Sequence, residues 1–247
     1  MENPSCVSAI LPLADPGRLL LARRAVNSFL RQAYTPYELL IVNGTEEKVL
    51  TNDQMSTPEI QQAGCSVVEL KVPPHLNAAT MRNHGIKAAT GSWIFPIDDD
   101  DFCHPFRLLY QMAHRRGVKP CLLRYQLRLD VSKALRMEEE LVGDGAHKPL
   151  LHLLRMDSGV PSTLLFPRLN TAGKTNLYCE DLNVGEHDEL LSRLLEPVVC
   201  DNMHTPFVQT LGWPVLSVAV YHGRNELSYR DFFLDAKQET PMMPKGL

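Results

Sequence analysis

Short apolar runs separated by helical patterns dominate the first part of this chain. The runs are typical of buried strands and occupy 6–13, 37–42, 67–72 and 93–97. Apolar residues at helical spacing predict a helix over 19–33, and the segment 78–89 is expected to form another. This alternation predicts βαβ units in a largely parallel sheet, and therefore an α/β fold.

The second half of the chain has a different pattern. Residues 121–130 alternate between apolar and polar positions, which predicts a strand with one solvent-facing side, as is typical of antiparallel pairing. Further helices are expected near 148–155 and 186–195, and further strands over 163–167 and 215–221. The sequence shows no internal repeat, low-complexity tract or linker. We therefore expect one domain, with at most a short appendage.

Composition narrows the class of protein. With 44% hydrophobic residues among 247, the chain can bury a full core without disulfides or structural metals. The net charge of −4 gives no general argument for binding nucleic acid or an anionic membrane. The six cysteines lack CxxC spacing, and neither a signal peptide nor a membrane-spanning run is evident. These features predict a soluble protein in a reduced, cytoplasmic setting.

Four consecutive aspartates, Asp98 to Asp101, follow the apolar run 93–97. Like charges at a strand end raise each other's pKa unless a cation relieves them, and Mg²⁺ and Mn²⁺ prefer oxygen ligands such as carboxylates. In parallel sheets, ligands bind beyond the carboxyl ends of the strands, where Asp15 and the segment 43–46 are also expected. The aspartates therefore predict a metal or phosphate site. The alternative is an acidic turn that caps a helix beginning near His104.

Several motifs together resemble the family 2 glycosyltransferases, which use nucleotide sugars on the A-type glycosyltransferase fold. The matching segments are Val7–Pro12, Ala25–Gln32, Glu38–Val42, Met81–Ile86, Ile97–Asp101, Gly185–Arg193 and Tyr221–Asn225. The resemblance covers residues 6–228 and implies one domain over 1–228, with a Rossmann-like, mostly parallel mixed sheet flanked by helices. It implies a nucleotide-sugar-binding half over 1–101 and an acceptor-binding half over 102–228. A C-terminal helix and a frayed tail are expected over 229–247.

In this resemblance, the aspartates hold the donor and its metal. Asp98 is implied to lie near the donor ribose and the metal, and Asp100 to bind the Mn²⁺ or Mg²⁺ that bridges the donor diphosphate. Asp99 and Asp101 could share this work, Asp99 also at the donor, and the sequence leaves that division open. His222 is implied to complete the metal shell or to touch the diphosphate, with a purely structural histidine as the alternative.

Other matching residues are implied to contact the nucleotide. Arg82 would contact the base or the diphosphate of the donor, and Pro12 and Leu13 would border the nucleobase. Asn43 stands where the family usually carries an acidic pair that reads the nucleobase. Because asparagine donates as well as accepts hydrogen bonds, the donor preference, including a UDP-sugar, stays open.

The resemblance implies metal-dependent sugar transfer, with in-line attack that inverts the anomeric carbon and a residue that takes the proton of the acceptor hydroxyl. In the segment Glu186-His187-Asp188, alignment puts His187 where the family usually has aspartate, and a shift by one residue offers Asp188. Asp188 is the favoured base because it shares a helical face with downstream leucines and is expected to point inward. Glu186, His187 and Asp181 are the other candidates. The alternative is an acidic first turn that complements the helix dipole.

A basic stretch in the second half bears on the acceptor. It consists of Arg115, Arg116, Lys119, Arg124, Arg128, Lys133 and Arg136. It is either a solvated face or a contact for an anionic acceptor, such as a lipid-linked diphosphate, an acidic glycan or nucleic acid. Nucleic acid is not favoured, because few aromatic residues lie in this stretch.

Two other functions stay open beside transfer to a saccharide or anionic acceptor. A nucleotidyltransferase would also use aspartates and a metal, although the first strand is not followed by a glycine-rich, lysine-containing loop. A catalytically lapsed nucleotide-sugar-binding module would account for Asn43 and for the irregular Glu-His-Asp motif.

Overall fold

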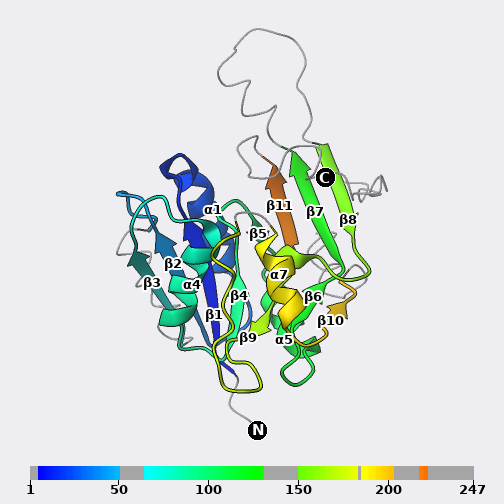
Figure 1. The fold of residues 1–247 in the computed structure, drawn as a ribbon. Helices are drawn as coiled ribbons and strands as arrows, with labels where there is room; N and C mark the ends of the chain where they lie inside the picture. Colours follow the sequence, from blue (N-terminus) through cyan, green and yellow to red (C-terminus); the bar gives the residue numbers. More distant parts are fainter. Residues whose placement is uncertain (1–4, 51–63, 131–149, 183–184, 203–216, 222–247) are drawn as a thin grey trace, which may run out of the picture.

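A computed structural model describes residues 5–50, 64–130, 150–182, 185–202 and 217–221, which form an α/β structure (Figure 1). Its largest sheet has the strand order β3 (Ser66–Lys71), β2 (Tyr37–Asn43), β1 (Val7–Leu13), β4 (Trp93–Pro96) and β9 (Phe166–Pro167). The first four strands are parallel, and β9 runs antiparallel to β4. The expected α/β fold with a mostly parallel mixed sheet is confirmed.

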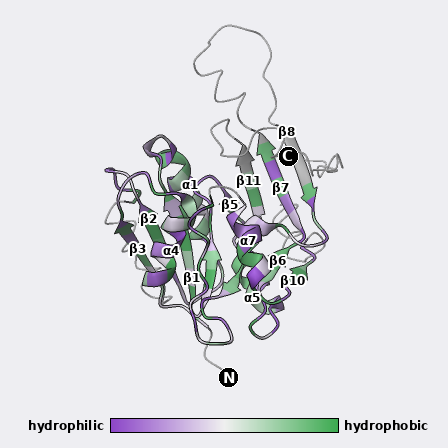
Figure 2. Cartoon of the chain, viewed as in Figure 1, coloured by the Kyte–Doolittle hydropathy of each residue, from purple (hydrophilic) through white to green (hydrophobic). Residues whose placement is uncertain are grey.

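Helices cover both faces of this sheet, because its strands direct alternate side chains into two apolar layers. The helical elements beside it are η1 (Pro16–Arg18), α1 (Leu19–Phe29) and α4 (Ala78–Ala88). On one face, Leu11 of β1 lies in the cluster that includes Val26 of α1. On the other face, the preceding residue of β1, Ile10, lies in the cluster that includes Ile86 of α4. Figure 2 shows hydrophobic residues concentrated in the central strands between these helices.

The order of the strands creates a switch point between β1 and β4. From β1 the chain passes through α1 to β2 and β3 on one side, and then returns through α4 to β4 on the other side of β1 (Figure 1). The carboxyl ends of these parallel strands lie at one edge, and ligands of open α/β sheets bind at such a switch point. The turn after β1 and the aspartates after β4 therefore lie together at this edge.

The second half forms two smaller sheets. One is a parallel pair of β10 and β6, and the other has the strand order β5-β11-β7-β8. The strands are β5 (Phe102–Cys103), β6 (Cys121–Leu123), β7 (Tyr125–Asp130), β8 (Leu150–Arg155), β10 (Val198–Cys200) and β11 (Ser217–Tyr221). The helical elements are α5 (Arg107–His114), η2 (Pro161–Thr163) and α7 (Glu186–Arg193).

Two expectations for this half are wrong. The helix expected near 148–155 is the strand β8, because this segment pairs antiparallel with β7 along its whole length. The single strand expected over 121–130 is interrupted at Arg124 and contributes to both small sheets. Its expected solvent-facing side is covered at Gln126, which is 1% exposed and hydrogen-bonded to two serine hydroxyls. Tertiary contacts thus cover, at Gln126, the face of the strand that its alternating pattern predicts to be exposed to solvent.

The other expected elements are found with shorter bounds. The helix over 186–195 is α7, and the described part of the strand over 215–221 is β11. The strand over 163–167 is reduced to β9, which follows η2. The expected C-terminal helix and tail over 229–247 lie outside the described residues. Within the described ranges, no helix combines the length and apolar character needed to cross a bilayer.

Candidate functional site

The four aspartates form a turn directly after β4, at the carboxyl edge of the sheet, in which Asp98 is partly exposed and the other three are buried. Asp101 N donates to Asp98 O at 3.2 Å, and Asp99, Asp100 and Asp101 are 6%, 7% and 4% exposed. The alternative that they cap the next helix is wrong, because α5 begins at Arg107 and its N-cap makes no side-chain hydrogen bond. The acidic run is therefore delivered into the protein by β4 and not spread over solvent.

Arg18 comes from the turn after β1 and pairs with two of these carboxylates. Its Nη2 lies 2.6 Å from Asp99 Oδ1 and 2.5 Å from Asp100 Oδ2. The turn is held by Asp15, whose Oδ1 accepts a hydrogen bond from Gly17 N at 2.8 Å. Asp15 is thus a turn residue. Arg18 was not among the predicted site residues, and its place just after the first strand is the one sequence signal for it.

Arg82 of α4 connects the aspartates to α7. Its Nη2 lies 2.5 Å from Asp98 Oδ1, and its Nη1 lies 2.5 Å from Glu186 Oε1. The side chain is 4% exposed, and its guanidinium carbon lies 5.5 Å from the centre of the Tyr178 ring. The structure thus brings three predicted site residues, Arg82, Asp98 and Glu186, into one chain of contacts.

The first turn of α7 presents its three candidate bases in different directions. His187 and Leu190 are the buried residues of this helix, whereas Asp188 is exposed. The expectation that Asp188 points inward with Leu191 and Leu195 is wrong, because Leu195 is itself 46% exposed and the interior face runs through His187. Glu186 is the candidate whose carboxylate contacts the site, through Arg82.

Burial shifts the pKa of several groups here. Burial lowers the pKa of His187 to about 4, and Arg82 acts in the same direction, so this imidazole is neutral at pH 7. Although Asp188 is exposed, partial desolvation by its neighbours raises the pKa of its carboxyl group, and the charge of Glu186 adds to this shift. Burial works to raise the pKa of Asp98, but Arg82 outweighs it and holds this pKa below its usual value.

The site carries an excess of negative charge. Asp98 to Asp101 and Glu186 supply five carboxylates, against the guanidinium groups of Arg18, Arg82 and Arg107. Burial raises the pKa of Asp99 and Asp101 well above the usual range, and neighbouring aspartates add to this. Carboxyl groups that are crowded together and outnumber their arginine partners fit a hard divalent cation. Among the described residues, no three potential ligands already surround one point.

The residues expected near the nucleobase are buried. Asn43 is fully buried, and its Oδ1 accepts a hydrogen bond from Thr45 N at 2.7 Å. Its Nδ2 donates to Glu47 O at 2.7 Å and to Glu69 Oε1 at 2.6 Å. Both ends of this amide therefore hold the loop after β2, and direct contact of Asn43 with a donor stays a prediction.

Pro12 and Leu13 end β1, and their side chains are buried within the sheet. The carbonyl of Leu13 accepts a hydrogen bond from Gly44 N at 2.9 Å, which ties the ends of β1 and β2 together. Their contact with a nucleobase stays a prediction. His222 lies outside the described residues, so its expected role at the metal is untested.

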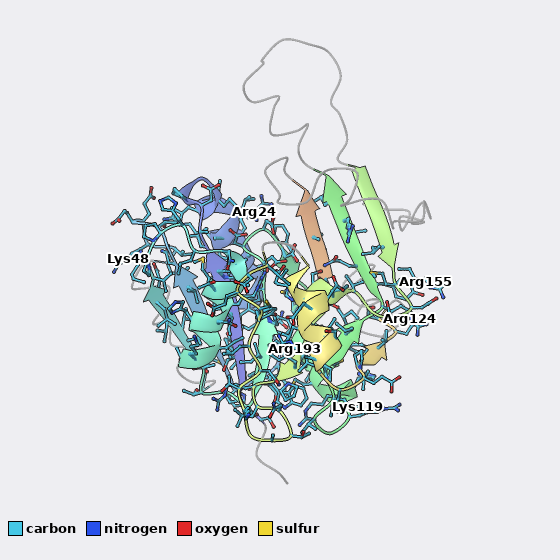
Figure 3. The ribbon with its side chains drawn as sticks, viewed as in Figure 1. Arg24, Lys48, Lys119, Arg124, Arg155 and Arg193 are labelled. Atoms are coloured by element: carbon cyan, nitrogen blue, oxygen red, sulfur yellow. The ribbon has the colours of Figure 1, made fainter. Side chains whose placement is uncertain are left out.

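The described members of the basic stretch have different partners. Arg115 lies 5.6 Å from the centre of the Trp93 ring, and Lys119 Nζ lies 3.9 Å from Glu196 Oε2. Figure 3 shows Arg124 beside Arg155 and well apart from Lys119. Two further members, Lys133 and Arg136, lie outside the described residues. Contact of the described members with an anionic acceptor therefore stays a prediction.

Comparison with protein families gives an independent view of the same residues. The family described as "Glycosyl transferase family 2" matches residues 18–116, which include Arg18, Arg82 and the aspartates. The putative colanic acid biosynthesis glycosyl transferase WcaA of Escherichia coli (strain K12) is 31% identical over 123 residues, covering 48% of this chain and 40% of WcaA. The chain spans less than half the length of the curated relatives it matches.

Solved structures share the fold at low identity. The structure of S. aureus TarS 1–349 in complex with UDP-GlcNAc matches with a TM-score of 0.55 and 13% identity, covering 92% of this chain and 63% of TarS 1–349. The mannosyltransferase PcManGT from Pyrobaculum calidifontis, in complex with GDP-Man and Mn²⁺, matches with a TM-score of 0.50 and 13% identity, covering 93% of this chain and 60% of that protein. Residues 18–116 are thus similar to glycosyltransferase family 2, and the fold of the chain is the A-type glycosyltransferase fold.

Proposed function

We propose that this protein transfers a sugar from a nucleotide-sugar donor to an acceptor hydroxyl at the carboxyl ends of β1 and β4. The observation that carries this proposal is the largely buried turn Asp98 to Asp101, which Arg18 and Arg82 contact at the switch point of the sheet. The structural neighbours contain UDP-GlcNAc and GDP-Man, which supports a nucleotide sugar as donor. We take a UDP-sugar as the first donor to test.

We propose Mn²⁺ or Mg²⁺ as the cofactor, held by Asp98 and Asp100. The excess of carboxylates supports this assignment, as does the Mn²⁺ in the PcManGT complex. When bound, such an ion stabilises negative charge on a diphosphate leaving group. The two guanidinium groups supply further positive charge, because a diphosphate can replace a carboxylate as the partner of Arg18 or Arg82.

Glu186 is our candidate for the base that accepts the proton of the acceptor hydroxyl. Among the three candidates in the first turn of α7, it is the one whose described contacts include an arginine of the site, Arg82. A donor phosphate that draws Arg82 away would release the Glu186 carboxylate. Asp188 remains the alternative, because it is open to solvent and its pKa is raised. In either case, one attack from the face opposite the leaving group inverts the anomeric carbon.

Variants in α7 separate these two bases. Glu186→Gln is expected to reduce turnover by about 10²-fold or more, whereas Asp188→Asn stays within a few-fold of the wild type. The control is Glu189→Gln in the same helix, because Glu189 pairs with the exposed Arg193. Loss of turnover in Asp188→Asn alone would move the base to Asp188.

A ligand screen tests the function as a whole. A panel of nucleotide sugars is added with and without Mn²⁺, and thermal stabilisation is measured together with release of nucleoside diphosphate. We expect one donor to raise the melting temperature and to be turned over only with metal. Asp100→Asn should lose both effects, and Asp157→Asn, which changes an exposed aspartate paired with Arg155, should keep them. Binding without turnover would identify a binding module, and nucleotide-sugar synthesis from a triphosphate would identify a nucleotidyltransferase.

A further inference from the structure

Tyr178 lies between the donor side and the α7 side of the site. It is 3% exposed, and Asn83 of α4 holds its backbone from both directions. Tyr178 N donates to Asn83 Oδ1 at 2.8 Å, and Asn83 Nδ2 donates to Tyr178 O at 2.9 Å. Because Arg82 and Asn83 are neighbours in α4, the helix that presents Arg82 also fixes Tyr178.

The side chain of Tyr178 contacts both partners of Glu186. Its ring centre lies 5.5 Å from the guanidinium carbon of Arg82, which donates to Glu186. Its hydroxyl lies 3.1 Å from His187 Nδ1, and the rings of Tyr178 and His187 pack edge to face with centres 5.4 Å apart. The other ring nitrogen, His187 Nε2, lies 3.9 Å from Glu186 Oε1.

Charge decides which nitrogen of His187 carries the proton. Burial keeps the imidazole neutral at pH 7, so only one nitrogen is protonated. Burial also raises the pKa of Tyr178 above its usual value, so the phenol keeps its proton. This buried proton needs an acceptor, and among the described contacts the acceptor within reach is His187 Nδ1 at 3.1 Å. The Glu186 carboxylate favours a proton on the nitrogen that faces it. Both neighbours therefore favour the Nε2–H tautomer.

We propose that Tyr178 is a positioning residue: its hydroxyl donates to His187 Nδ1, fixes the Nε2–H tautomer and directs that N–H toward Glu186. In this tautomer, His187 Nε2 carries a proton and has no free lone pair on the side of Glu186. His187 therefore orients the Glu186 carboxylate, and it does not itself accept the substrate proton. The role in turnover rests on the proposed function, whereas the tautomer is a property of the protein alone.

Nitrogen-15 NMR of the histidine side chains tests the tautomer without any substrate. With ¹⁵N-histidine-labelled protein, and His187→Gln to assign the signal, we expect the wild type to show His187 as the Nε2–H form. Tyr178→Phe keeps the ring under Arg82 and removes the hydroxyl, so the Nδ1–H form should become populated. The matched control is Tyr110→Phe, which removes a buried tyrosine hydroxyl that donates to Asp201 O. A wild-type His187 in the Nδ1–H form, or an unchanged tautomer in Tyr178→Phe, would overturn the proposal.

Turnover tests whether the tautomer matters for the reaction. Tyr178→Phe should lower kcat about 2- to 10-fold, the range expected for one lost hydrogen bond, with the KM for the donor unchanged. His187→Gln, whose amide can still donate toward Glu186, should keep more kcat than His187→Asn. Equal loss in both His187 variants, or a Tyr178→Phe effect confined to KM, would refute the positioning role. Absence of sugar transfer in the wild type would contradict the proposed function and leave the NMR result standing.

Discussion

Arg18 Nη2 lies 2.5 Å from Asp100 Oδ2, although 82 positions separate the two residues in the sequence. The contact joins the turn after β1 to the turn after β4 across the switch point of the sheet. Arg18 also lies 2.6 Å from Asp99 Oδ1, so one guanidinium covers two of the four carboxylates. A divalent cation that binds Asp100 therefore competes with Arg18 for the same oxygen atoms.

Removing this competitor is expected to strengthen binding of a divalent ion. Arg18→Gln should raise the affinity for Mn²⁺ about 3- to 10-fold in the absence of nucleotide, since a partly buried ion pair contributes on the order of 1 kcal/mol. Isothermal titration calorimetry at constant pH measures this. Arg23→Gln is the control, because Arg23 donates to backbone carbonyls of the neighbouring loop. Weaker Mn²⁺ binding in Arg18→Gln would show that Arg18 supports the metal site.

Among the arginines of the site, Arg82 is expected to contribute most to the stability of the folded protein. Arg82→Gln leaves the carboxylates of Asp98 and Glu186 without their common cation, which should cost about 3 kcal/mol of unfolding free energy. Urea denaturation at pH 7 measures the loss. In Arg193→Gln the broken pair with Glu189 is exposed, so the cost should be about 0.5 kcal/mol or less. Similar losses in the two variants would contradict a buried role for Arg82.

Glu38 should make stability depend on pH at the end of the sheet remote from the site. Its carboxylate accepts hydrogen bonds from Ser8 Oγ and Thr90 N, both at 2.5 Å, and from Gly91 N at 3.0 Å. Burial works to raise its pKa, but these hydrogen bonds outweigh burial and hold the pKa below its usual value of 4.5. The folded pKa is therefore lower than the unfolded one. The ionised group stabilises the fold above pH 4.5, and this contribution is lost as the pH falls through the folded pKa.

Glu38→Gln tests that pH dependence. It should lower the unfolding free energy at pH 7 by about 1–3 kcal/mol, and its difference from the wild type should shrink as the pH falls below 4.5. Urea denaturation from neutral to acidic pH measures both. Glu196→Gln, at a side chain that is 89% exposed, should follow the wild type throughout. A difference that stays constant with pH would show that the ionised form of Glu38 is not what matters.

Gly85 sets how closely α4 approaches β1. A Cβ atom on this residue would lie 2.6 Å from Ile10 Cγ2, nearer than such atoms pack. Alanine is favoured over glycine in a helix by about 1 kcal/mol, but overpacking of a core costs about 1–3 kcal/mol. Gly85→Ala should therefore destabilise the protein and, by moving Arg82 in the same helix, weaken donor binding. His84→Ala, on the exposed side of α4, should change neither quantity in thermal and binding assays.

Local sequence patterns were enough to predict most strands and helices in the first half of the chain. The apolar runs predict β1 to β4 because a buried parallel strand needs nothing more than a short apolar segment, and the helical spacing predicts α1 and α4. The rule that ligands bind beyond the carboxyl ends of such strands then places Asp98 to Asp101 at a site. The motif around Arg82 was also recognisable, because it lies in one continuous helix.

Long-range contacts decided the rest. The segment of β8 has no local feature that distinguishes it from a helix, and its pairing with β7 makes it a strand. Asp188 shares a helical face with leucines, yet the interior runs through His187, because packing against Tyr178 sets the rotation of α7.

The sequence by itself determined that four aspartates follow a strand at the ligand edge of an α/β sheet, since local periodicity predicts the strand and its alternation with helices. Only the tertiary structure decided their partners. Arg18, Arg82 and Glu186 come from three separate elements, and the burial that gives their charges such influence exists only once those elements pack together.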